Sequence, residues 1–376
     1  MRVHSFTLKS TDYCNLACTY CYSPNTKKVN YIRTDVLERL GQRMVSDFSP
    51  DQIFQIVWHG SEPMAVGVEF YRQATQIFRS YVGERIGQHM QTNLTLVDDE
   101  WITFFKEENF GVSTSIDGPR QVHDYYRIDH AGRGSYDKVI TAIHNLKAAD
   151  IDVSAITVAT KANIQYAQEI YYLVRDLNIN LRINPVIVAE ESSFCLPSEA
   201  YGEFVISVAN EWLQDTNAKF FLEPIRSMVL RLTTGQNLLC EQQALCYSHL
   251  TGVGTDGSLY PCNRFINVPE LKLGHIDETN PLEIPLLPIS QKAAKRHINA
   301  KCQNCKLLEV CQGGCMYHSH VIYGDAFRED YFCKSYVLLY DFIIANLPTL
   351  LSRLSAIPGG KELDNLVSTL MQPVAV

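Results

Sequence analysis

Three cysteines near the start of the chain have the spacing of a metal-ligand set. Cys14, Cys18 and Cys21 are separated by gaps of three and two residues. Such short gaps let three thiolates from one loop wrap around a single cubane iron–sulfur cluster and leave its fourth iron open to a substrate or cofactor. The alternatives are a zinc site that lacks one ligand and three unrelated cysteines. Tyr20, an aromatic residue directly before the last cysteine, favours the cluster.

Eight more cysteines lie in the C-terminal third of the chain. They are Cys240, Cys246, Cys262, Cys302, Cys305, Cys311, Cys315 and Cys333. Two fully ligated 4Fe–4S clusters need four thiolates each, so this number suits a pair of clusters. A pair of zinc ribbons is the alternative, because a C-x2-C spacing alone fits either metal.

The twelfth cysteine, Cys195, stands apart from both groups. Most single cysteines are buried and inert. The alternative is a hydrogen-atom donor close to the substrate, as a radical epimerase would require. The sequence identifies no other candidate catalytic residue, and His318 and His320 receive no assignment although they lie near cysteines of the second group.

Composition and charge limit the class of protein. The chain has 376 residues, of which 46% are hydrophobic, so it can bury a sizeable core. The net charge of -8 and the scattered Lys and Arg residues argue against a nucleic-acid partner. No apolar run reaches the ~20 residues that cross a bilayer, and the N-terminus does not resemble a signal peptide. We therefore expect a cytoplasmic protein with no membrane partner, in which clustered cysteines bind metal more often than they form disulfides.

The N-terminal half of the chain alternates strand-like and helix-like segments. The predicted strands span residues 3–8, 53–58, 89–92, 111–116, 153–158 and 181–188. The predicted helices between them span residues 34–47, 68–81, 98–108, 136–149 and 163–177. This alternation predicts an α/β fold whose parallel sheet forms a partial (β/α)6 barrel similar to a TIM barrel, with the chemistry at the carboxyl ends of the strands.

The pattern changes after Pro197. Helices are predicted at 198–215 and 222–233, and Asp256-Gly257 signals a β-hairpin within residues 252–261. The chain is then expected to be loop-rich until an apolar helix near residues 336–347. Because a loop-rich, cysteine-dense stretch has little core of its own, metal clusters are expected to hold it together.

The first cysteine motif resembles a known signature. C-x3-C-x2-C with Tyr20 before the last cysteine is similar to the motif of the radical S-adenosylmethionine (SAM) superfamily. The resemblance implies that the amino and carboxylate groups of SAM chelate the open iron. It also implies that an electron from the reduced cluster breaks the sulfonium bond, and that the resulting 5'-deoxyadenosyl radical removes a hydrogen atom from the substrate.

Further segments, each at or after the end of a predicted strand, resemble SAM-binding segments of this superfamily. They are Trp58-His59-Gly60-Ser61-Glu62-Pro63, Gln91-Thr92-Asn93, and Ser115-Ile116-Asp117-Gly118-Pro119 with Arg127. The residues that the resemblance implies in SAM binding are Tyr20, Gly60, Ser61, Glu62, Asn93, Ser115 and Arg127. Ser61 stands where the family usually has glycine, so a conformation there that only glycine adopts would count against the contact. A simple turn and a surface ion pair are the alternatives for Asp-Gly-Pro and for Arg127.

The late cysteines resemble the SPASM extension of radical enzymes that modify peptides and proteins. The resemblance implies that auxiliary cluster I is held by Cys240, Cys246, Cys262 and Cys315. It implies that auxiliary cluster II is held by Cys302, Cys305, Cys311 and Cys333. The expected cofactors are therefore three 4Fe–4S clusters and SAM. The implied organisation is a radical SAM core at 1–197, a helical linker at 198–239, a SPASM domain at 240–346 and a C-terminal tail at 347–376.

One enzyme group with this cysteine spacing is the anaerobic sulfatase-maturating enzymes, which convert Ser or Cys to formylglycine. In that family an aspartate follows the cysteine that corresponds to Cys262 and takes the proton from the substrate. Asn263 occupies this position here. Because asparagine cannot act as a base near neutral pH, the sequence favours a different reaction.

The favoured function is maturation of a ribosomally made precursor peptide by an oxidative cross-link. Residues 57–63, 69–71 and 115–134 are similar to peptide maturases that form carbon–carbon (cyclophane) or thioether links. The auxiliary clusters suit an oxidation, because a substrate radical that has formed a new bond must lose an electron. The expected partners are the precursor peptide and an electron donor such as flavodoxin or ferredoxin. A peptide epimerase and a non-catalytic iron–sulfur scaffold are further alternatives.

Overall fold

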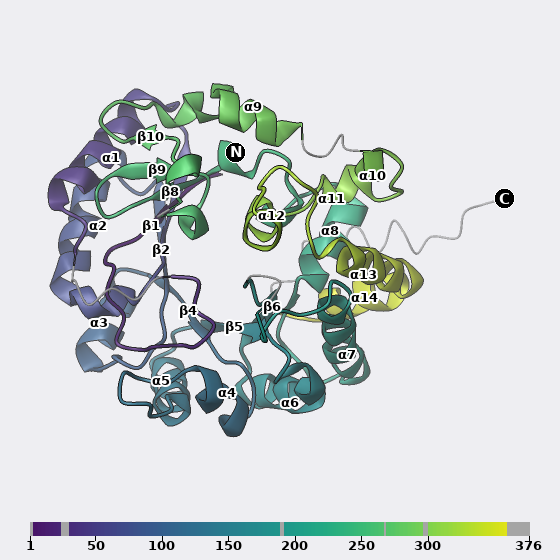
Figure 1. Cartoon of the computed structure of the whole chain (residues 1–376). Coiled ribbons are helices and arrows are strands. Elements are labelled where there is room, and N and C mark those ends of the chain that lie inside the picture. The colour runs from purple at the N-terminus through teal and green to yellow at the C-terminus, as the bar shows by residue number, and fades with distance from the viewer. Residues whose placement is uncertain (1–2, 24–29, 189–191, 267, 296–299, 359–376) are drawn as a thin grey trace. The chain divides into compact units, whose positions relative to one another are not determined.

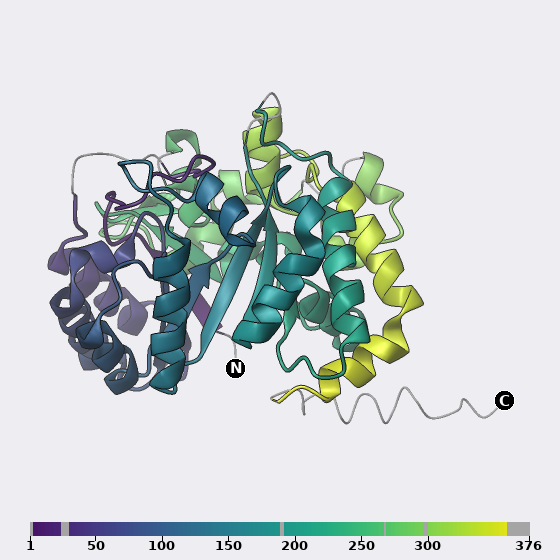
Figure 2. The same cartoon turned by 90° about the horizontal axis from the view of Figure 1, so that it is seen from below.

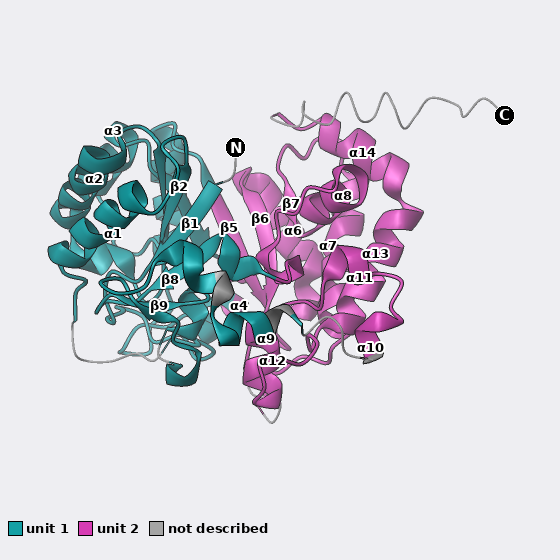
Figure 3. Ribbon diagram, turned by 90° about the horizontal axis from the view of Figure 1, so that it is seen from above, with its two compact units in different colours: residues 1–115, 123–153, 245–295 teal, residues 116–122, 154–244, 296–376 magenta. Residues whose placement is uncertain are grey.

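The computed structural model describes residues 3–23, 30–188, 192–266, 268–295 and 300–358 (Figure 1). The chain divides into two compact units, each assembled from segments that are distant in sequence (Figure 3). Unit 1 contains residues 1–115, 123–153 and 245–295, and unit 2 contains residues 116–122, 154–244 and 296–376. Both units therefore bring late segments of the chain onto earlier ones.

Unit 1 is built on a sheet with the strand order β10-β9-β8-β1-β2-β3-β4. The bounds are β1 Val3–Leu8, β2 Ile53–Trp58, β3 Ile86–Gln91, β4 Gly111–Ser115, β8 Leu250–Val253, β9 Ser258–Tyr260 and β10 Gly274–His275. Strands β1 to β4 are parallel, and β8 joins the free edge of β1 in parallel, with Ser5 opposite Leu250. The hairpin of β8 and β9 is antiparallel, as is the β9–β10 pair.

Aromatic side chains pack two helices of unit 1, α2 and α3, against its sheet. The helices are α1 Thr34–Ser46, α2 Val68–Val82, α3 Asp99–Glu107, α5 Tyr136–Ala148 and α9 Pro288–Ala294, and α4 Arg120–Tyr126 runs from residues of unit 2 into residues of unit 1. Trp58 meets Tyr71 edge-on with ring centroids 5.1 Å apart, and the Tyr71 ring lies 6.3 Å from that of Phe104. Burial of side chains of this size stabilises the fold by about 1.5–3 kcal/mol each. The Tyr71 hydroxyl also lies 2.9 Å from Ser10 Oγ and 2.7 Å from Pro63 O, so the core reaches the segments that follow β1 and β2.

The opposite face of β2 and β3 carries polar side chains that lie across glycines of the next strand. Gln55 pairs in register with Gly87, and His89 pairs with Gly111. A Cβ atom at Gly87 would lie 2.6 Å from Gln55 Oε1, and one at Gly111 would lie 2.5 Å from His89 Nδ1. Any larger residue at either glycine would displace the polar side chain, so the glycines shape this face of the sheet.

Unit 2 contains the parallel strands β5 Val153–Ala159, β6 Asn180–Pro185 and β7 Leu222–Glu223 in that order. Its helices are α6 Ala167–Leu177, α7 Ala200–Gln214, α8 Ile225–Thr234, α10 Ala300–Gln303, α11 Leu308–Cys311, α12 Met316–Tyr323, α13 Cys333–Ala345 and α14 Leu347–Ser355. Helix α7 packs against both α6 and α13 (Figure 2). A Cβ atom at Gly202 of α7 would lie 2.8 Å from Ser335 Cα, and Gly202 N donates to Ser335 Oγ at 2.7 Å. The glycine therefore lets α13, which begins at a cysteine, approach α7 closely.

The predicted α/β fold with a parallel sheet is confirmed. Strands β1 and β2 have the predicted bounds, and the other four predicted strands and the five helices between the strands form within a few residues of theirs. The predicted hairpin is β8–β9. These elements were predictable because their apolar residues alternate or recur at the helical period.

The structure differs from the predictions in several later or shorter elements. The helix predicted at 222–233 starts only at Ile225, because residues 222–223 pair with β6 and Pro224 has no N–H for a helix interior. Helix α4 was not predicted. The stretch predicted to be loop-rich contains the short helices α9 to α12, and the predicted apolar helix begins earlier, at Cys333. The domain bounds implied by the SPASM resemblance stay predictions.

Helices α13 and α14 follow one another near the end of the part of the chain that the structure describes. No single helix there is long and apolar enough to cross a bilayer, and these two pass the test of length and composition only together, across a bend of 80°. Helix α14 occupies the first part of the predicted C-terminal tail. Residues 359–376 of that tail lie outside the described residues.

Candidate active site

The three N-terminal cysteines lie on the loop that follows β1, residues 9–23, which we call the cysteine loop. Ala17 N donates to Ile128 O at 2.7 Å, and Thr19 N donates to Tyr126 O at 3.0 Å. These bonds join the loop to the segment around the end of α4. A long loop with no regular structure of its own is thereby held in one position in unit 1.

The three thiols of this loop lie within electrostatic reach of one another. Burial raises the pKa of the Cys14 thiol, and the charges of Glu62, Cys18 and Cys21 raise it further. Iron binds cysteine as the thiolate, so occupation by a metal cluster would release these protons. Among the described residues, no three His, Cys, Asp or Glu side chains converge closely enough to hold a single metal ion.

Asn93, which follows β3, connects the end of that strand to the cysteine loop. Its Nδ2 donates to Asn15 Oδ1 at 2.8 Å and lies 3.9 Å from Cys14 Sγ. Asn15 in turn donates through Nδ2 to Thr95 Oγ1 at 2.8 Å. The structure therefore brings one predicted SAM-binding residue, Asn93, directly to the first cysteine.

Glu62 joins the carboxyl ends of β2 and β3. Its carboxylate accepts hydrogen bonds from Met64 N at 3.0 Å, Thr92 Oγ1 at 2.5 Å and Asn93 N at 2.8 Å. Burial raises its pKa to about 7, although these three bonds oppose the shift. With its oxygens so engaged, Glu62 is placed to shape the site, and its own backbone N–H donates to Tyr13 O at 3.1 Å.

Gly60 and Ser61 take left-handed backbone conformations between β2 and Glu62. Gly60 has φ of 97° and Ser61 has φ of 53°. The value at Ser61 lies in the region that residues other than glycine can adopt, at a cost of about 1–2 kcal/mol. The conformation is therefore not one reserved for glycine, and the Ser61 hydroxyl lies 3.4 Å from Ser23 Oγ of the cysteine loop. The predicted contact of Ser61 with SAM stays a prediction.

Tyr20 and Arg127 lie against each other. The Arg127 guanidinium carbon lies 5.4 Å from the centroid of the Tyr20 ring, which also meets the Tyr126 ring edge-on at 5.2 Å. Only 8% of Arg127 is exposed. Arg127 is therefore not a surface residue, and its side chain lies against an aromatic ring of the cysteine loop.

Ser115, which is also predicted to bind SAM, ends β4. Its hydroxyl accepts a hydrogen bond from Gln91 Nε2 at 3.3 Å. The sequence pointed to the segment of Gln91 but gave that residue no role of its own.

An ion pair that the sequence did not predict lies beside the cysteine loop. Lys9 Nζ lies 2.7 Å from Asp12 Oδ1, and their side chains are only 3% and 17% exposed. A Cβ atom at Gly60 would lie 3.3 Å from Lys9 Cγ, so the lysine stem packs over Gly60. The available signal was a lysine directly after a buried strand, a position where an unpaired charge would be costly.

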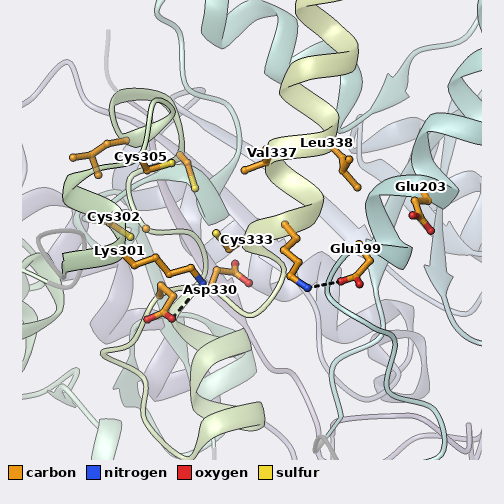
Figure 4. Close-up of a pocket in the computed structure, with 14 residues that line it drawn as sticks. Glu199, Glu203, Lys301, Cys302, Cys305, Asp330, Cys333, Val337 and Leu338 are labelled. Carbon is orange, nitrogen blue, oxygen red and sulfur yellow. Dashed lines mark hydrogen bonds and ion pairs between the residues drawn. The ribbon is translucent and has the colours of Figure 1, made fainter.

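The four cysteines predicted to hold auxiliary cluster II line one pocket of unit 2 (Figure 4). The pocket has a volume of about 580 Å³. Its cysteines are Cys302, Cys305, Cys311 and Cys333. Two ion pairs lie along its wall, Lys334–Glu199 at 3.3 Å and Lys301–Glu329 at 3.5 Å. Four thiols around one cavity are a donor set that suits an iron–sulfur cluster.

Asp330 lies in the wall of this pocket and was not predicted from the sequence. Its carboxylate accepts hydrogen bonds from Cys315 N at 2.7 Å, Phe332 N at 2.8 Å, Tyr336 Oη at 3.0 Å and His318 Nδ1 at 3.0 Å. Burial opposes its ionisation, but the charge and hydrogen bond of His318, with the two backbone N–H groups, hold the pKa of Asp330 below its usual range. No role was predicted for His318 because histidines are common at protein surfaces, but His318 is buried.

The cysteines predicted for auxiliary cluster I are divided between the units. Cys246 and Cys262 belong to unit 1, and Cys240 and Cys315 belong to unit 2. Asn263, directly after Cys262, donates through Nδ2 to Tyr22 Oη at 2.8 Å. Tyr22 follows Cys21, so within unit 1 this bond joins the cysteine loop to the segment of Cys262.

Cys195 is buried, with 5% of its surface exposed. Its sulfur lies 3.6 Å from the carbonyl oxygen of Leu196. Both the inert-thiol and the hydrogen-donor interpretations of Cys195 stay predictions.

Comparison with protein families identifies the N-terminal part of the chain. Residues 8–174 match the family model described as the Radical SAM superfamily. These residues form a Radical SAM domain. The family implies a 4Fe–4S cluster and SAM as cofactors, and the three thiols of the cysteine loop are a donor set that fits the cluster.

Curated relatives match nearly nine-tenths of the chain. The cysteine-type anaerobic sulfatase-maturating enzyme of Clostridium novyi is 26% identical over 352 residues, which is 89% of this chain and 93% of the relative. The serine-type anaerobic sulfatase-maturating enzyme of Bacteroides thetaiotaomicron is 27% identical over 367 residues, which is 88% of this chain and 86% of the relative.

Solved structures share the fold. The structure described as native anSMEcpe with bound AdoMet and Cp18Cys peptide has a TM-score of 0.82 at 22% identity, covering 98% of this chain and 99% of that one. SuiB of Streptococcus suis bound to precursor peptide SuiA has a TM-score of 0.64 at 15% identity, covering 89% of this chain and 76% of that one. The chain therefore has the α/β fold of these proteins.

Proposed function

We propose that this radical SAM enzyme oxidises a ribosomally made precursor peptide and links two of its side chains by a carbon–carbon or thioether bond. When bound, SAM and its cluster supply a radical that removes a hydrogen atom from the substrate. Two hydrogens leave the peptide in total, and the proton and electron released on bond formation need acceptors. The expected partners are the peptide and a small electron-transfer protein such as flavodoxin or ferredoxin.

We further propose three 4Fe–4S clusters, with the ligand division that the SPASM resemblance implies. The pocket lined by four cysteines supports the assignment of auxiliary cluster II. The proximity of three thiols supports the SAM cluster. SAM would contact the residues around the cysteine loop, where Asn93 lies beside Cys14 and Arg127 lies against Tyr20.

The observation that carries the choice of reaction is the side chain of Asn263. Its amide nitrogen is committed as a donor to Tyr22 Oη. An amide also has no site that accepts a proton near neutral pH, unlike the aspartate of sulfatase maturases. Formylglycine formation therefore lacks its usual base at this position, whereas cross-linking does not depend on that aspartate.

Formylglycine formation is the second candidate, and the curated relatives favour it. Enzymes named as sulfatase-maturating match this chain over most of their length. This function would require a base other than residue 263. A peptide epimerase and a non-catalytic scaffold are weaker alternatives, because nothing beyond buried Cys195 supports the first and the radical SAM family membership opposes the second.

The test is product analysis under anaerobic conditions. The reconstituted holoenzyme is incubated with SAM, a reductant and either a precursor peptide encoded beside its gene or a Cys-containing sulfatase peptide. Cross-linking predicts a precursor product that has lost two hydrogen atoms, kept its sulfur and gained no aldehyde. Conversion of the sulfatase peptide to an aldehyde with loss of sulfur would contradict the proposal. If no 5'-deoxyadenosine is produced with either peptide, the scaffold alternative holds.

A matched pair of variants sharpens this test. In Asn263→Asp the new carboxylate can accept a hydrogen bond from Tyr22 Oη, so the contact is kept while a base is supplied. We expect this variant to gain aldehyde-forming activity on the Cys peptide. Asn263→Leu, which has neither base nor hydrogen bond, should gain none, and Tyr22→Phe controls for loss of the contact alone.

A further inference from the structure

A chain of hydrogen bonds crosses the polar face of β3 and β4 in unit 1. His89 Nε2 lies 2.7 Å from Ser113 Oγ, Ser113 Oγ donates to Gln91 Oε1 at 2.5 Å, and Gln91 Nε2 donates to Ser115 Oγ at 3.3 Å. The strand register explains the contacts, because Gln91 lies opposite Ser113 and His89 lies opposite Gly111. Gln91 and Ser113 are more than nine-tenths buried.

The structure orients the Gln91 amide with its oxygen toward Ser113 and its nitrogen toward Ser115, and with this orientation the hydrogen bonds have one consistent direction. A hydroxyl has a single proton, and Ser113 gives its proton to Gln91, so His89 must be the donor to Ser113. The amide of Gln91 accepts with its oxygen and donates with its nitrogen. Ser115 therefore receives a hydrogen bond, and its own proton is left to point elsewhere.

The Ser115 proton has no acceptor among the described residues, for which Ser115 makes only the bond to Gln91. Ser115 ends β4, at the edge of the sheet where the radical SAM fold places its chemistry. A hydroxyl that already accepts a bond from a buried amide meets a ligand best as a donor. The ligand atom beside it must then be an acceptor.

We propose that Gln91, oriented by Ser113 and His89, is a positioning residue that fixes the Ser115 hydroxyl as a hydrogen-bond donor to an oxygen of SAM. The oxygen belongs to the carboxylate or to the ribose of the cofactor. This inference rests on the SAM contact proposed for Ser115. It does not depend on which peptide the enzyme modifies.

One substitution can reverse the direction of the hydrogen bond between residue 91 and Ser115. In Gln91→Glu both carboxylate oxygens accept, so Ser115 turns its proton inward and presents only lone pairs to the cofactor. Gln91→Met removes both bonds without imposing a direction. Loss of a hydrogen bond to a charged or strongly polar ligand predicts SAM binding weaker by about tenfold or more for Gln91→Glu, and by a few fold for Gln91→Met.

Gln88→Glu is the matched control, because it is the same change on the other face of the same strand. Gln88 accepts a hydrogen bond from Trp58 Nε1 at 3.0 Å and donates one to Thr75 Oγ1 at 2.7 Å. In Gln88→Glu the carboxylate still accepts from Trp58, and the Thr75 hydroxyl has a proton that it can donate to the second oxygen. This variant should bind SAM like the unmodified enzyme. Iron content and far-UV circular dichroism show whether each variant is folded and loaded.

The measurement is SAM affinity of the oxidised holoenzyme, by equilibrium dialysis without reductant, so that no turnover occurs. The proposal requires that Ser115→Ala weakens binding and that Gln91→Glu then has no further effect in the Ser115→Ala background. It is overturned if Gln91→Glu binds normally, or if it weakens binding equally with and without Ser115. Normal affinity of Ser115→Ala itself would also overturn it. Failure of the peptide reaction with normal SAM binding would instead count against the proposed function.

A second ligand identifies the accepting oxygen. Methylthioadenosine keeps the ribose of SAM and lacks its carboxylate. If Gln91→Glu weakens its binding as well, the ribose accepts the Ser115 proton. If only SAM is affected, the carboxylate accepts it, and either result supports the donor role of Ser115.

Discussion

Glu62 in unit 1 and Asp330 in unit 2 are two buried carboxylates that perform the same task with different electrostatics. They are 1% and 2% exposed, and each accepts hydrogen bonds from residues of the loops that it joins. Asp330 has the imidazole of His318 among its donors. Glu62 has backbone N–H groups and a hydroxyl, and among the described residues no cation lies within ion-pairing distance of it.

The difference appears in the pKa values. Burial dominates at Glu62 and raises its pKa to about 7. At Asp330 burial acts in the same direction, but His318 and the backbone donors outweigh it and the pKa is lowered. Three hydrogen bonds from neutral groups therefore do not offset burial at Glu62, whereas an imidazole together with two backbone N–H groups does so at Asp330.

The largest effect should come from deleting the two carboxylates in turn. Asp330→Ala leaves His318, Tyr336 and two backbone N–H groups without their acceptor, and breaking such a buried pair costs about 3–5 kcal/mol. Glu62→Ala leaves three neutral donors unpaired and should cost less, about 1–3 kcal/mol. Hydrogen exchange of peptides covering residues 315–336 and 60–95 measures each local loss, with exposed Glu69→Ala as control. Equal losses in the two regions would break the comparison.

The pH dependence of stability should distinguish the two regions next. Because the pKa of Glu62 rises from 4.5 to about 7 on folding, the native state binds its proton more tightly than the unfolded state between these values. The stability of residues 60–95 should therefore fall as pH rises through this window, by up to about 3 kcal/mol. Hydrogen exchange at several pH values, corrected for intrinsic rates, should show this slope in the parent protein and not in Glu62→Gln. A flat profile in both would show that Glu62 does not titrate there.

Removing the imidazole should make Asp330 behave like Glu62. His318→Leu leaves the carboxylate with its backbone and Tyr336 donors but without the imidazole, so the pKa of Asp330 should rise. We expect a loss of about 1–3 kcal/mol around residues 315–336, larger at pH 8 than at pH 6, because ionisation is then costly. Iron content of the reconstituted variant reports whether the neighbouring cysteine pocket still fills. A loss that does not depend on pH would mean that His318 acts through packing on Phe332 alone.

The smallest effects should come from removing one hydroxyl donor from each carboxylate. Tyr336→Phe and Thr92→Val each delete a single hydrogen bond, worth about 0.5–1.5 kcal/mol. Thr92→Val should also raise the pKa of Glu62 further, since that bond opposes the shift. The cost of Thr92→Val should then vary with pH, while the cost of Tyr336→Phe stays constant between pH 6 and pH 8. Reversal of this pattern would contradict the roles assigned here.

The sequence predicted what depends on local pattern. Alternating apolar residues marked β1 and β2 with their observed bounds, and the resemblance to the SPASM extension marked the four cysteines that line one pocket. It could not predict Asp330, His318 or Lys9, because their roles depend on partners that only the folded chain supplies. Asp330 is an ordinary acidic residue in a polar stretch until four donors converge on it.

The pairing of β8 with the edge strand β1 could not be predicted from the sequence either. Residues 250–253 were recognised as part of a hairpin, yet nothing local showed that they would join β1 in parallel. Pro224 is the opposite case, because a local signal for the start of α8 was present. Proline is disfavoured in a helix interior, so Pro224 indicated a start after it. The helical period of the apolar residues around Pro224 nevertheless led to the prediction of an earlier start. Long-range strand pairing depends on the whole sheet, and sequence pattern specifies it weakly.

The pairing of β1 with β8 has a consequence for how the chain matures. Residues 3–8 leave the ribosome well before their partner at 250–253. At ordinary rates of synthesis the interval is on the order of 10 to 50 s. During this time one border of the nascent sheet exposes unsatisfied amides and carbonyls, which is a hazard for association with other growing chains. Chaperone dependence during translation should therefore be most acute before residue 250 emerges.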